Sequence, residues 1–512
     1  MTELHDARAP RRTTLVFELA LLLVLGAAVR LVGVGESLWL DELFTSWVVL
    51  GPDGTLPERA ALGNAAAPFY WLVKESVEVF GVSEWAIRLP SIAFGALVSL
   101  VVYVLTWTIS GSMCAGRVAG VLVALDGFCC AYAAEARPYS VLQFFGALQL
   151  LAYWKLLNGG SAWWRIGFVA CTIAMGYLHF VGLAVVAGEI VYYALIWIRG
   201  ERPAYTPLRF LVDLGLAGVA LLPLVPLVLS ILGRKTNFDI SAKPVGLEDL
   251  VILHRQPAYL ILPFVAAAFV QFARRVEPDA PRRWIVPLAF CLIVFYATVG
   301  PLWVGHRIGG PTLFRLRYTM VLYLLPLVAA GIASVAWSSR GARVVFALAA
   351  LVFSQLVESP ARRIASGGSP RLSHDDWRGA VRVVNEKATP TTPVFVRAGW
   401  IETDGYLASD GPLIGSYLTL PVRTLYKLDG PERMVRSLTF AGDFALDADV
   451  ELVARAGEAW VFVQGDSATI DKVVERVIAR LTKSGMSVTV ADRTAKRNVT
   501  VFRVIVTPTR PA

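Results

Sequence analysis

Runs of roughly 20 apolar residues, the length that an α-helix needs to cross a bilayer, recur along this chain up to about position 357. The chain is 56% hydrophobic and only 17% charged, whereas a soluble domain has about a quarter charged residues. Beyond 357, charges, Gly and Pro return and no run is long enough to span. The pattern excludes a wholly soluble protein. It predicts a polytopic α-helical membrane domain over residues 1–358 and a soluble domain over 359–512.

We predict eleven membrane spans from these runs. Their ranges are 14–34, 91–109, 117–134, 138–156, 163–178, 180–198, 209–232, 256–272, 284–304, 318–338 and 343–357. Arg8, Arg11 and Arg12 precede the first run, which is long enough to remain as a helix rather than a cleaved signal.

The segment 66–81 is not counted as a span. Its apolar residues Phe69, Val73, Val77 and Phe80 fall on one helical face, but charged residues interrupt it. This pattern is typical of a helix lying in the membrane interface. Without a span here, the short Arg-rich loops lie inside, as the positive-inside rule requires. The first loop (35–90) and the C-terminal domain are then expected on the extracytoplasmic side of the membrane.

The net charge of +9 would suggest nucleic acid in a soluble protein. Here much of the excess comes from Arg in short loops, so we expect the bilayer, and no nucleic acid, as the partner. All five cysteines lie in or beside apolar runs, which argues against disulfides and Cys-type metal sites. The C-terminal domain is expected to be α/β. Its predicted elements are helices near 376–387 and 467–481 and strands near 394–397, 460–463, 487–491 and 499–505, after a linker at 366–370.

Two polar clusters border predicted spans. The first loop begins with Glu36–Glu42, in which Asp41 and Glu42 follow a tryptophan. An adjacent carboxylate pair at a membrane surface can act as a general base; the alternative is a solvated helix start with an interfacial Trp anchor. The corner Glu135–Tyr139 separates two spans almost without a loop. Arg137 there can grip a phosphate with its planar fork, or it can simply pair with Glu135.

Further polar residues have two interpretations each. Outward cations, which include Arg88, Arg315 and Arg317, fit either a bound lipid phosphate or anionic headgroups in general. His179 fits a binding residue or a hydrogen-bonded structural one. Asp126 within the third span marks a functional or paired carboxylate, or a helix break at Gly127. The cluster His374–Asp376 is interpreted as a helix N-cap rather than a metal site.

At these residues the sequence resembles the GT-C membrane glycosyltransferases, in particular the bacterial branch related to protein O-mannosyltransferases and lipid A aminoarabinose transferases. The similarity runs from about Leu15 to Gly200 and resumes at Arg315–Leu327 and Asp376–Ala380. The family's residues fall on Asp41 and Glu42 in the first loop, on Glu135, Arg137, Pro138 and Tyr139 at the corner, on His179, and on the stretch Ser83–Pro90. Two positions depart from the family pattern: Ala66-Ala67-Pro68 stands where relatives often have His-Pro-Pro, and Asp126-Gly127 where they often have Ser-Pro.

The resemblance implies transfer of a sugar from a polyprenyl-phosphate carrier to a lipid, glycan or protein acceptor, with a juxtamembrane helix at 66–81. We expect an inverting reaction in which Asp41 is the base, Glu42 orients it and Arg137 stabilises the leaving phosphate. Arg88, Glu135, Tyr139, His179, Arg315 and Arg317 are expected to bind the donor phosphate or sugar. No cofactor and no metal are expected. The alternatives are a non-enzymatic lipid-linked glycan transporter or flippase, and a glycan-binding sensor.

Overall fold

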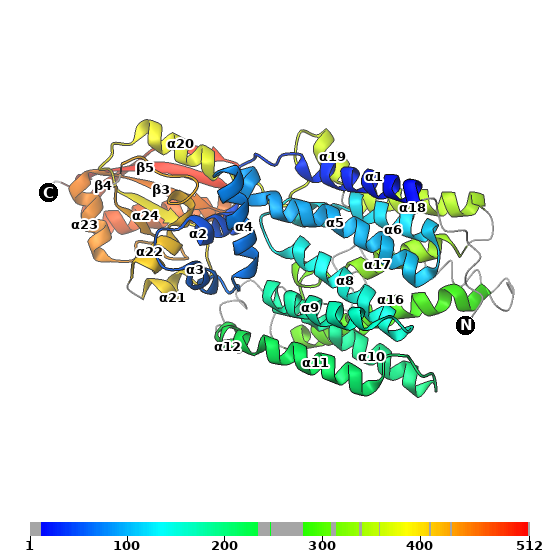
Figure 1. The fold of residues 1–512 in the computed structure, drawn as a ribbon. Coiled ribbons are helices and arrows are strands. Elements are labelled where there is room, and N and C mark those ends of the chain that lie inside the picture. The colour runs from blue at the N-terminus through cyan, green and yellow to red at the C-terminus, as the bar shows by residue number, and fades with distance from the viewer. Residues whose placement is uncertain are drawn as a thin grey trace. The chain divides into compact units, whose positions relative to one another are not determined.

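The computed structural model describes residues 12–233, 246, 280–308, 314–336, 340–357, 359–408, 411–430 and 433–509. It is mostly helical, with one β-sheet near the C-terminus (Figure 1). The described residues divide into two compact units. The helical unit comprises residues up to Val34 and those from Arg88 to Arg371. The sheet unit comprises Gly35–Ile87 and the residues from Leu372 onward.

The helical unit is built from apolar helices. They are α1 (Arg12–Leu31), α5 (Glu84–Ser110, whose first turn belongs to the sheet unit), α6 (Met113–Leu125), α7 (Gly127–Ala133), α8 (Tyr139–Leu157), α9 (Ala162–Leu178), η1 (Phe180–Leu183), α10 (Ala184–Ile198), α11 (Pro207–Leu221), η2 (Leu222–Leu224), α12 (Val225–Gly233), α16 (Ala280–Arg307), η4 (Leu316–Tyr318), α17 (Leu324–Ser334), α18 (Arg340–Val357) and α19 (Pro360–Ala365).

Six stretches of described helix are long and apolar enough to cross a membrane, or seven if the bent pair α6–α7 is one span. Helices α9 and α17 are apolar but shorter. Large apolar side chains such as Phe17 on α1 and Leu208 and Leu211 on α11 are exposed, as expected for surfaces that face lipid. The count of eleven spans stays a prediction, and its span at 256–272 lies outside the described residues.

Asp126 breaks the helix in the third predicted span. Helix α6 ends at Leu125, and α7 begins at Gly127 with a bend of 56°. The Asp126 side chain caps α7, because Oδ1 accepts hydrogen bonds from the backbone N–H groups of Phe128 (3.0 Å) and Cys129 (2.9 Å). Its other oxygen accepts one from the Tyr323 hydroxyl at 2.8 Å. Of the interpretations of Asp126, the helix break and the paired carboxylate are both confirmed.

The sheet unit combines residues from both ends of its sequence. Its elements are α2 (Leu40–Leu50), α3 (Leu56–Leu62), α4 (Pro68–Phe80), α20 (Trp377–Lys387), β1 (Val394–Arg397), α21 (Thr403–Leu407), α22 (Pro412–Leu418), η5 (Leu420–Val422), β2 (Val435–Ser437), α23 (Asp447–Ala456), β3 (Glu458–Gln464), α24 (Ser467–Lys483), β4 (Met486–Lys496) and β5 (Val499–Pro508). This grouping differs from the predicted domains, in which the first loop belonged to the membrane domain.

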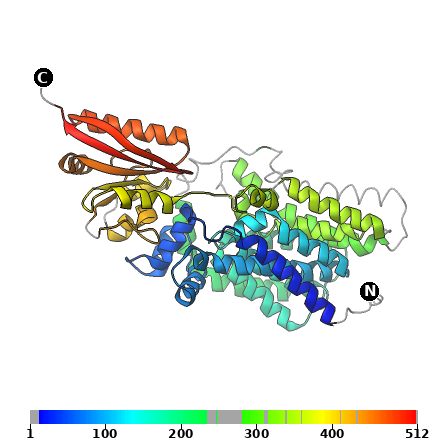
Figure 2. The same cartoon turned by 90° about the horizontal axis from the view of Figure 1, so that it is seen from above.

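The five strands have the order β2-β1-β3-β5-β4 (Figures 1 and 2). Strand β1 pairs in parallel with β2 and β3, whereas β5 pairs antiparallel with β3 and β4. Val461 and Val463 of β3 pack with α23 and α24, whereas Phe462 stacks on Trp377 of α20. Because successive strand residues face opposite sides, helices cover both faces of the sheet. The two predicted helices and four predicted strands of this region are each present; β1 has the predicted ends, and the others have shifted ends. The elements β2, α21, α22 and α23 were not predicted.

Helix α4 occupies the segment 66–81, where the sequence predicted an interfacial helix. Phe69, Val73 and Val77 of the proposed membrane face are buried inside the sheet unit, where α4 packs on α2. The prediction of a helix is confirmed, but that face is used for protein packing. Phe80, the fourth residue of that face, is exposed at the end of α4, and the other exposed apolar residues of this helix are Trp71, Leu72 and Val79.

Candidate functional site

The corner Glu135–Pro138 is fixed in place by the start of α5. The Ser91 hydroxyl donates to the carbonyl of Arg137 at 2.9 Å, and the Ser140 hydroxyl donates to the carbonyl of Ser91 at 2.7 Å. Within the corner, the N–H of Arg137 donates to the carbonyl of Glu135 at 2.8 Å. Glu135 is buried, and the Arg137 side chain is partly exposed. The backbone that carries these two side chains is therefore held by specific hydrogen bonds.

His179 brings several predicted residues together. It lies between α9 and η1, outside both apolar helices. Its ring centroid is 6.3 Å from that of Tyr139 and 4.9 Å from that of Tyr318. Burial, and then the positive charges of Arg317 and Arg137, lower the pKa of His179 to about 3. The imidazole is therefore neutral at physiological pH and has two guanidinium groups in its electrostatic surroundings.

Arg317 contacts the side chain of Tyr318, whose ring lies beside His179. Its guanidinium carbon lies 5.1 Å from the Tyr318 ring centroid, and its Nη2 donates to the Tyr318 hydroxyl at 3.3 Å. Burial, followed by the repulsion of Arg317, lowers the pKa of Arg315 and outweighs the opposing effect of Tyr318. Arg88 is fully buried, and its Nη1 donates to the carbonyl of Val34 at 2.6 Å. The helical unit thus collects the predicted cations, with Arg137 and Arg317 at one aromatic cluster.

Asp41 and Glu42 lie in the first turn of α2, in the sheet unit. Glu42 is fully buried and its Oε2 accepts a hydrogen bond from the N–H of Trp39 at 3.3 Å, as the N3 residue of a capping box. Asp41 is partly exposed. The two neighbours therefore differ: Glu42 secures the helix start, and Asp41 keeps access to solvent.

The segment before α2, Gly35–Trp39, is called the connector here, and residues from the C-terminal half of the sheet unit hold it. The connector N–H of Leu38 donates to the Tyr426 hydroxyl at 2.8 Å. Arg378 donates from its backbone N–H to the Ser37 hydroxyl (3.2 Å) and from Nη1 to the carbonyl of Gly35 (3.1 Å). These partners are 341, 343 and 388 positions apart in sequence. Distant residues therefore fix the path of the chain into α2.

The buried carboxylate Asp375 contacts the start of α2 itself. It accepts hydrogen bonds from the backbone N–H of Leu40 and from the amides of Asn498 (3.3 Å) and Gln464 (3.5 Å). Leu40 is the first residue of α2, where helix N–H groups lack an intrahelical partner and favour a negative charge. Burial nevertheless dominates and raises the pKa of Asp375.

Aromatic packing fixes the other side of α2. Trp47 contacts Phe44 and Tyr417, with ring centroids 6.1 and 5.4 Å away, and its Nε1 donates to the Ser416 hydroxyl at 3.2 Å. Trp400 stacks on Tyr417 at 5.4 Å. Because such aromatic contacts have preferred geometries, they add orientation as well as buried area. The helix that carries Asp41 is held on two sides by the C-terminal part of its unit.

Sequence analysis missed Asp375 as a contact of α2, and it missed Tyr426 altogether. Tyr318 and Arg378 lie in the similar stretches Arg315–Leu327 and Asp376–Ala380, but they were not assigned to a site. Asp376 was interpreted as an N-cap, and its Oδ1 does accept from the N–H of Gly379 at 2.8 Å. Within the part of the chain that the structure describes, no group of three His, Cys, Asp or Glu residues could hold a metal ion.

Comparisons with known proteins were made by family, by curated sequence and by structure. Residues 66–229 match the family model described as dolichyl-phosphate-mannose-protein mannosyltransferase. This range contains Arg88, the Glu135–Tyr139 corner and His179, and it begins after Asp41. No curated protein sequence matches.

Several solved structures are similar to this chain at low identity. ArnT from Cupriavidus metallidurans in the apo state is 13% identical over 96% of this chain and 98% of that one, with a TM-score of 0.45. Its form bound to undecaprenyl phosphate is 14% identical with the same coverage and a TM-score of 0.46. The oligosaccharyltransferase AglB from Archaeoglobus fulgidus, in complex with an inhibitory peptide and a dolichol-phosphate, is 12% identical over 94% of this chain and 74% of that one, with a TM-score of 0.48.

The family model covers the stretch Ser83–Pro90, the Glu135–Tyr139 corner and His179, but not Asp41–Glu42, Arg315–Leu327 or Asp376–Ala380. The chain is thus similar to the GT-C membrane glycosyltransferases related to protein O-mannosyltransferases, as its motifs indicated.

Proposed function

We propose that this protein is an inverting glycosyltransferase that moves a sugar from a polyprenyl-phosphate carrier to an envelope acceptor at the outer face of the bacterial inner membrane. The acceptor is a hydroxyl-bearing lipid, glycan or protein. The observation that carries the proposal is the aromatic cluster in which the rings of Tyr139 and Tyr318 lie beside His179 and the Arg317 guanidinium lies over Tyr318. Its Glu-x-Arg-Pro-Tyr corner lies inside the range that matches the mannosyltransferase family model.

The donor phosphate is proposed to bind in the helical unit. Guanidinium groups suit a phosphate because their planar fork meets two oxygens. Arg137 is the principal contact, with Arg88, Arg315 and Arg317 contributing positive charge and Glu135, Tyr139 and His179 shaping the site for phosphate or sugar. As the carbon–oxygen bond to the carrier breaks, negative charge grows on the phosphate, and preorganised cations stabilise it. A phosphate leaving group then needs little help from a proton donor.

The acceptor is proposed to be activated by Asp41. The acceptor oxygen attacks the anomeric carbon and forms the new glycosidic bond while the bond to the phosphate oxygen breaks. The acceptor proton passes to the Asp41 carboxylate, and the bonding electrons leave with polyprenyl phosphate. Asp41 suits this role because it is partly exposed at the start of a helix that its neighbours hold firmly, whereas Glu42 already accepts the Trp39 N–H. A single displacement of this kind inverts the anomeric centre.

A lipid-linked glycan transporter needs polar residues along a path through its spans. Among the described residues, Glu189 and Asp213 are buried carboxylates within apolar helices, and Asp126 is a third at the α6–α7 break. Glu189 of α10 accepts from the Gln149 amide at 2.8 Å, and Asp213 of α11 accepts from Arg165 at 2.7 and 2.8 Å and from Tyr205 at 2.6 Å. These bonds join neighbouring helices, so they favour a packing role over a transport path.

The experiment uses the purified protein in nanodiscs with a synthetic polyprenyl-phosphate sugar and an extract of envelope glycolipids. We expect release of free polyprenyl phosphate in a one-to-one ratio with sugar found on an acceptor. Movement of intact donor between leaflets of a proteoliposome, without release, would replace the transferase by the transporter.

The side of the membrane is a separate part of the proposal. Arg clusters in the predicted inward loops place the first loop and the C-terminus outside the cytoplasm. A phosphatase reporter fused after Ala512 should therefore be active, and a green fluorescent reporter at the same place should be dark. The opposite pair of readings would reverse the proposed orientation.

A further inference from the structure

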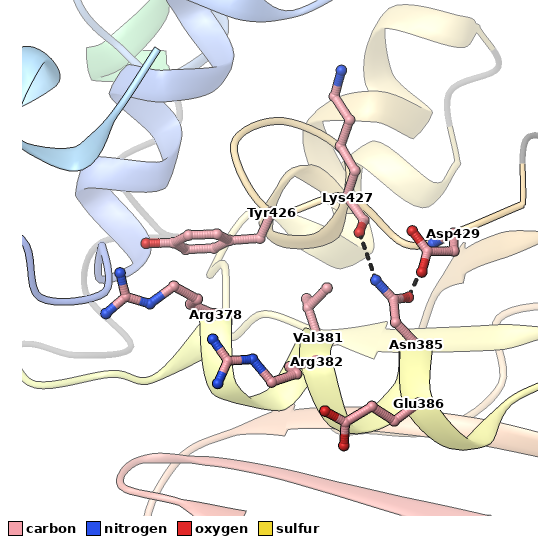
Figure 3. A pocket seen from close by; sticks show the side chains of 8 residues that line it. All are labelled: Arg378, Val381, Arg382, Asn385, Glu386, Tyr426, Lys427 and Asp429. Atoms are coloured by element: carbon pink, nitrogen blue, oxygen red, sulfur yellow. Dashed lines mark hydrogen bonds between the residues drawn. The ribbon is translucent and has the colours of Figure 1, made fainter.

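A cavity of about 350 Å³ lies in the sheet unit, beside α20 (Figure 3). This volume is within the range of small-molecule sites. Eight residues line it: Arg378, Val381, Arg382, Asn385, Glu386, Tyr426, Lys427 and Asp429. Five of these eight residues are charged, whereas a packing defect in a core is lined by apolar side chains.

The charges in the cavity are not neutralised by one another. Arg378 pairs with Glu84, with Nη1 2.9 Å from the carboxylate. The charged groups of Arg382 and Lys427 make no hydrogen bond or ion pair with any described residue, and both side chains are exposed. In Figure 3, Arg378 and Arg382 extend side by side at one end of the cavity, and Glu386 and Asp429 lie towards the other. The cavity has a cationic end and an acidic end.

The walls of this cavity are preorganised. The Asn385 amide donates to the carbonyl of Lys427 at 3.0 Å, and its oxygen accepts from the N–H of Asp429 at 3.0 Å, which fastens the loop to α20 (Figure 3). The Tyr426 hydroxyl donates to Glu84 at 3.1 Å and accepts from Leu38, so the ring cannot rotate away. A ligand entering here would meet a loop backbone and an aromatic ring that are already in place, which lowers the entropic cost of binding.

We propose that this cavity binds an anionic sugar, one that carries a phosphate or a carboxylate group. The anionic group is held by Arg382 and Arg378, whose forked donors match oxygen pairs. Glu386 and Asp429 accept hydrogen bonds from sugar hydroxyls, and Tyr426 supplies a ring to the wall. Arg378 already has Glu84 as a counter-charge, but an uncharged sugar would leave the Arg382 guanidinium without one, so the site distinguishes anionic from neutral sugars.

Two residues that line the cavity also hold the connector that leads to α2. Tyr426 and Arg378 line the cavity and hold Leu38, Ser37 and Gly35. If the proposed transferase function is correct, on which this step rests, the bound sugar is part of the acceptor. Acceptor binding then stabilises the path into the helix that carries Asp41.

The test measures binding without any donor, so that its failure is distinct from failure of the transferase proposal. Saturation-transfer NMR on the full-length protein in detergent would compare glucose 6-phosphate, glucuronate and glucose at equal ionic strength, with inorganic phosphate added as a competitor. The variants are Arg382→Gln and Lys427→Gln. The control is Arg455→Gln, because Arg455 is an exposed arginine of α23 that bonds only a carbonyl of its own helix among described residues.

We expect saturation transfer to the ring protons of both anionic sugars and none to glucose. Arg382→Gln should weaken this binding about tenfold and Lys427→Gln less, whereas Arg455→Gln should bind as wild type does. Equal binding of glucose, or unchanged binding by Arg382→Gln, would overturn the proposal. Displacement of glucose 6-phosphate by an equal concentration of inorganic phosphate would reduce the site to an anion site and overturn its assignment to a sugar.

Discussion

The helical unit and the sheet unit place their proposed functional residues by different means. In the helical unit the corner residues are almost consecutive, and hydrogen bonds from Ser91 and Ser140 fix their backbone. In the sheet unit Asp41 belongs to a helix whose start is held by Asp375, Arg378 and Tyr426, more than 330 residues later in sequence. A short motif is enough to specify the first arrangement, whereas the second depends on folding of the whole unit.

This difference has a functional counterpart. The family model matches 66–229, which holds Arg88, Arg137 and His179 of the proposed donor site but neither Asp41 nor the C-terminal residues that hold the start of its helix. We infer that donor binding depends on the helical unit and acceptor activation on the sheet unit. The following predictions test this division, beginning with the largest expected effect.

Replacing the proposed base should cause the largest loss. General-base catalysis contributes about 10²- to 10⁴-fold, so Asp41→Asn should lower turnover by at least about 100-fold. Glu42→Gln should cost less, because Glu42 acts through the helix start. Turnover is measured as polyprenyl phosphate released at saturating donor, with Glu75→Gln on α4 as an exposed control. Wild-type turnover by Asp41→Asn would remove Asp41 from the mechanism.

Arg137→Lys should give a smaller, selective effect on the donor. The change keeps the positive charge but loses the forked contact with phosphate, so we expect the donor KM to rise about tenfold with little change in kcat. Arg165→Lys makes the same chemical change at the Asp213 pair of the helical unit and serves as the control. If Arg137→Lys and Arg137→Ala both keep the wild-type KM, the Glu135–Arg137 corner is purely structural.

The buried carboxyl of Asp375 should show its effect as a pH dependence of stability. Because its folded-state pKa is raised, the folded protein holds this proton to a higher pH than the unfolded chain does. The resulting stabilisation is complete below the ordinary carboxyl pKa of about 3.9 and is lost as pH rises through the raised value. The Tm of wild type relative to Asp375→Asn should therefore fall as pH rises from about 4 to 7. A difference in Tm that stays constant over this range would show that the Asp375 carboxyl has the same pKa in the folded and unfolded states.

The smallest effect is expected from Tyr426→Phe, which removes the hydroxyl bonds to Leu38 and Glu84. Each such bond contributes about 1 kcal/mol, so global stability should change little. Hydrogen exchange at residues 36–41 should become about five- to tenfold faster, because about 1 kcal/mol corresponds to that ratio. Tyr406→Phe loses a similar bond, to the carbonyl of Leu62 at 3.2 Å, without touching the connector. Equal exchange at 36–41 in both variants would mean that Tyr426 does not hold the connector.

Sequence alone predicted much of the helical unit, because apolar run length and local motifs are properties of neighbouring residues. It placed the break at Asp126–Gly127, and it selected Tyr139 and His179, which do lie together. It did not predict that Tyr318 lies beside His179, because the local sequence around either residue does not indicate which distant ring it contacts. It predicted the strands β1 and β3 to β5 from their β-branched runs, but not the three-residue β2.

The sequence failed where contacts join distant segments. The apolar face of α4 has the pattern of an interfacial helix, but the same pattern fits packing on α2, and periodicity cannot tell lipid from protein. Asp375 was interpreted only as part of a capping cluster. Its hydrogen-bond donors, the backbone of Leu40 and the side chains of Gln464 and Asn498, are far away in sequence, so no local pattern indicates them. The predicted domain boundary at 358 stays a prediction, whereas the contacts of the structure group the first loop with the residues from Leu372 onward.

The most direct test of the proposed division measures donor affinity, independently of turnover, in two variants side by side. Equilibrium binding of a fluorescent, non-hydrolysable polyprenyl-phosphonate sugar is compared for Asp41→Asn and Arg137→Ala in nanodiscs. We expect Asp41→Asn to bind this analogue with the wild-type Kd and Arg137→Ala to bind it at least about tenfold more weakly. The reverse result, with loss of affinity in Asp41→Asn and none in Arg137→Ala, would contradict the assignment of donor binding to the helical unit and of acceptor activation to the sheet unit.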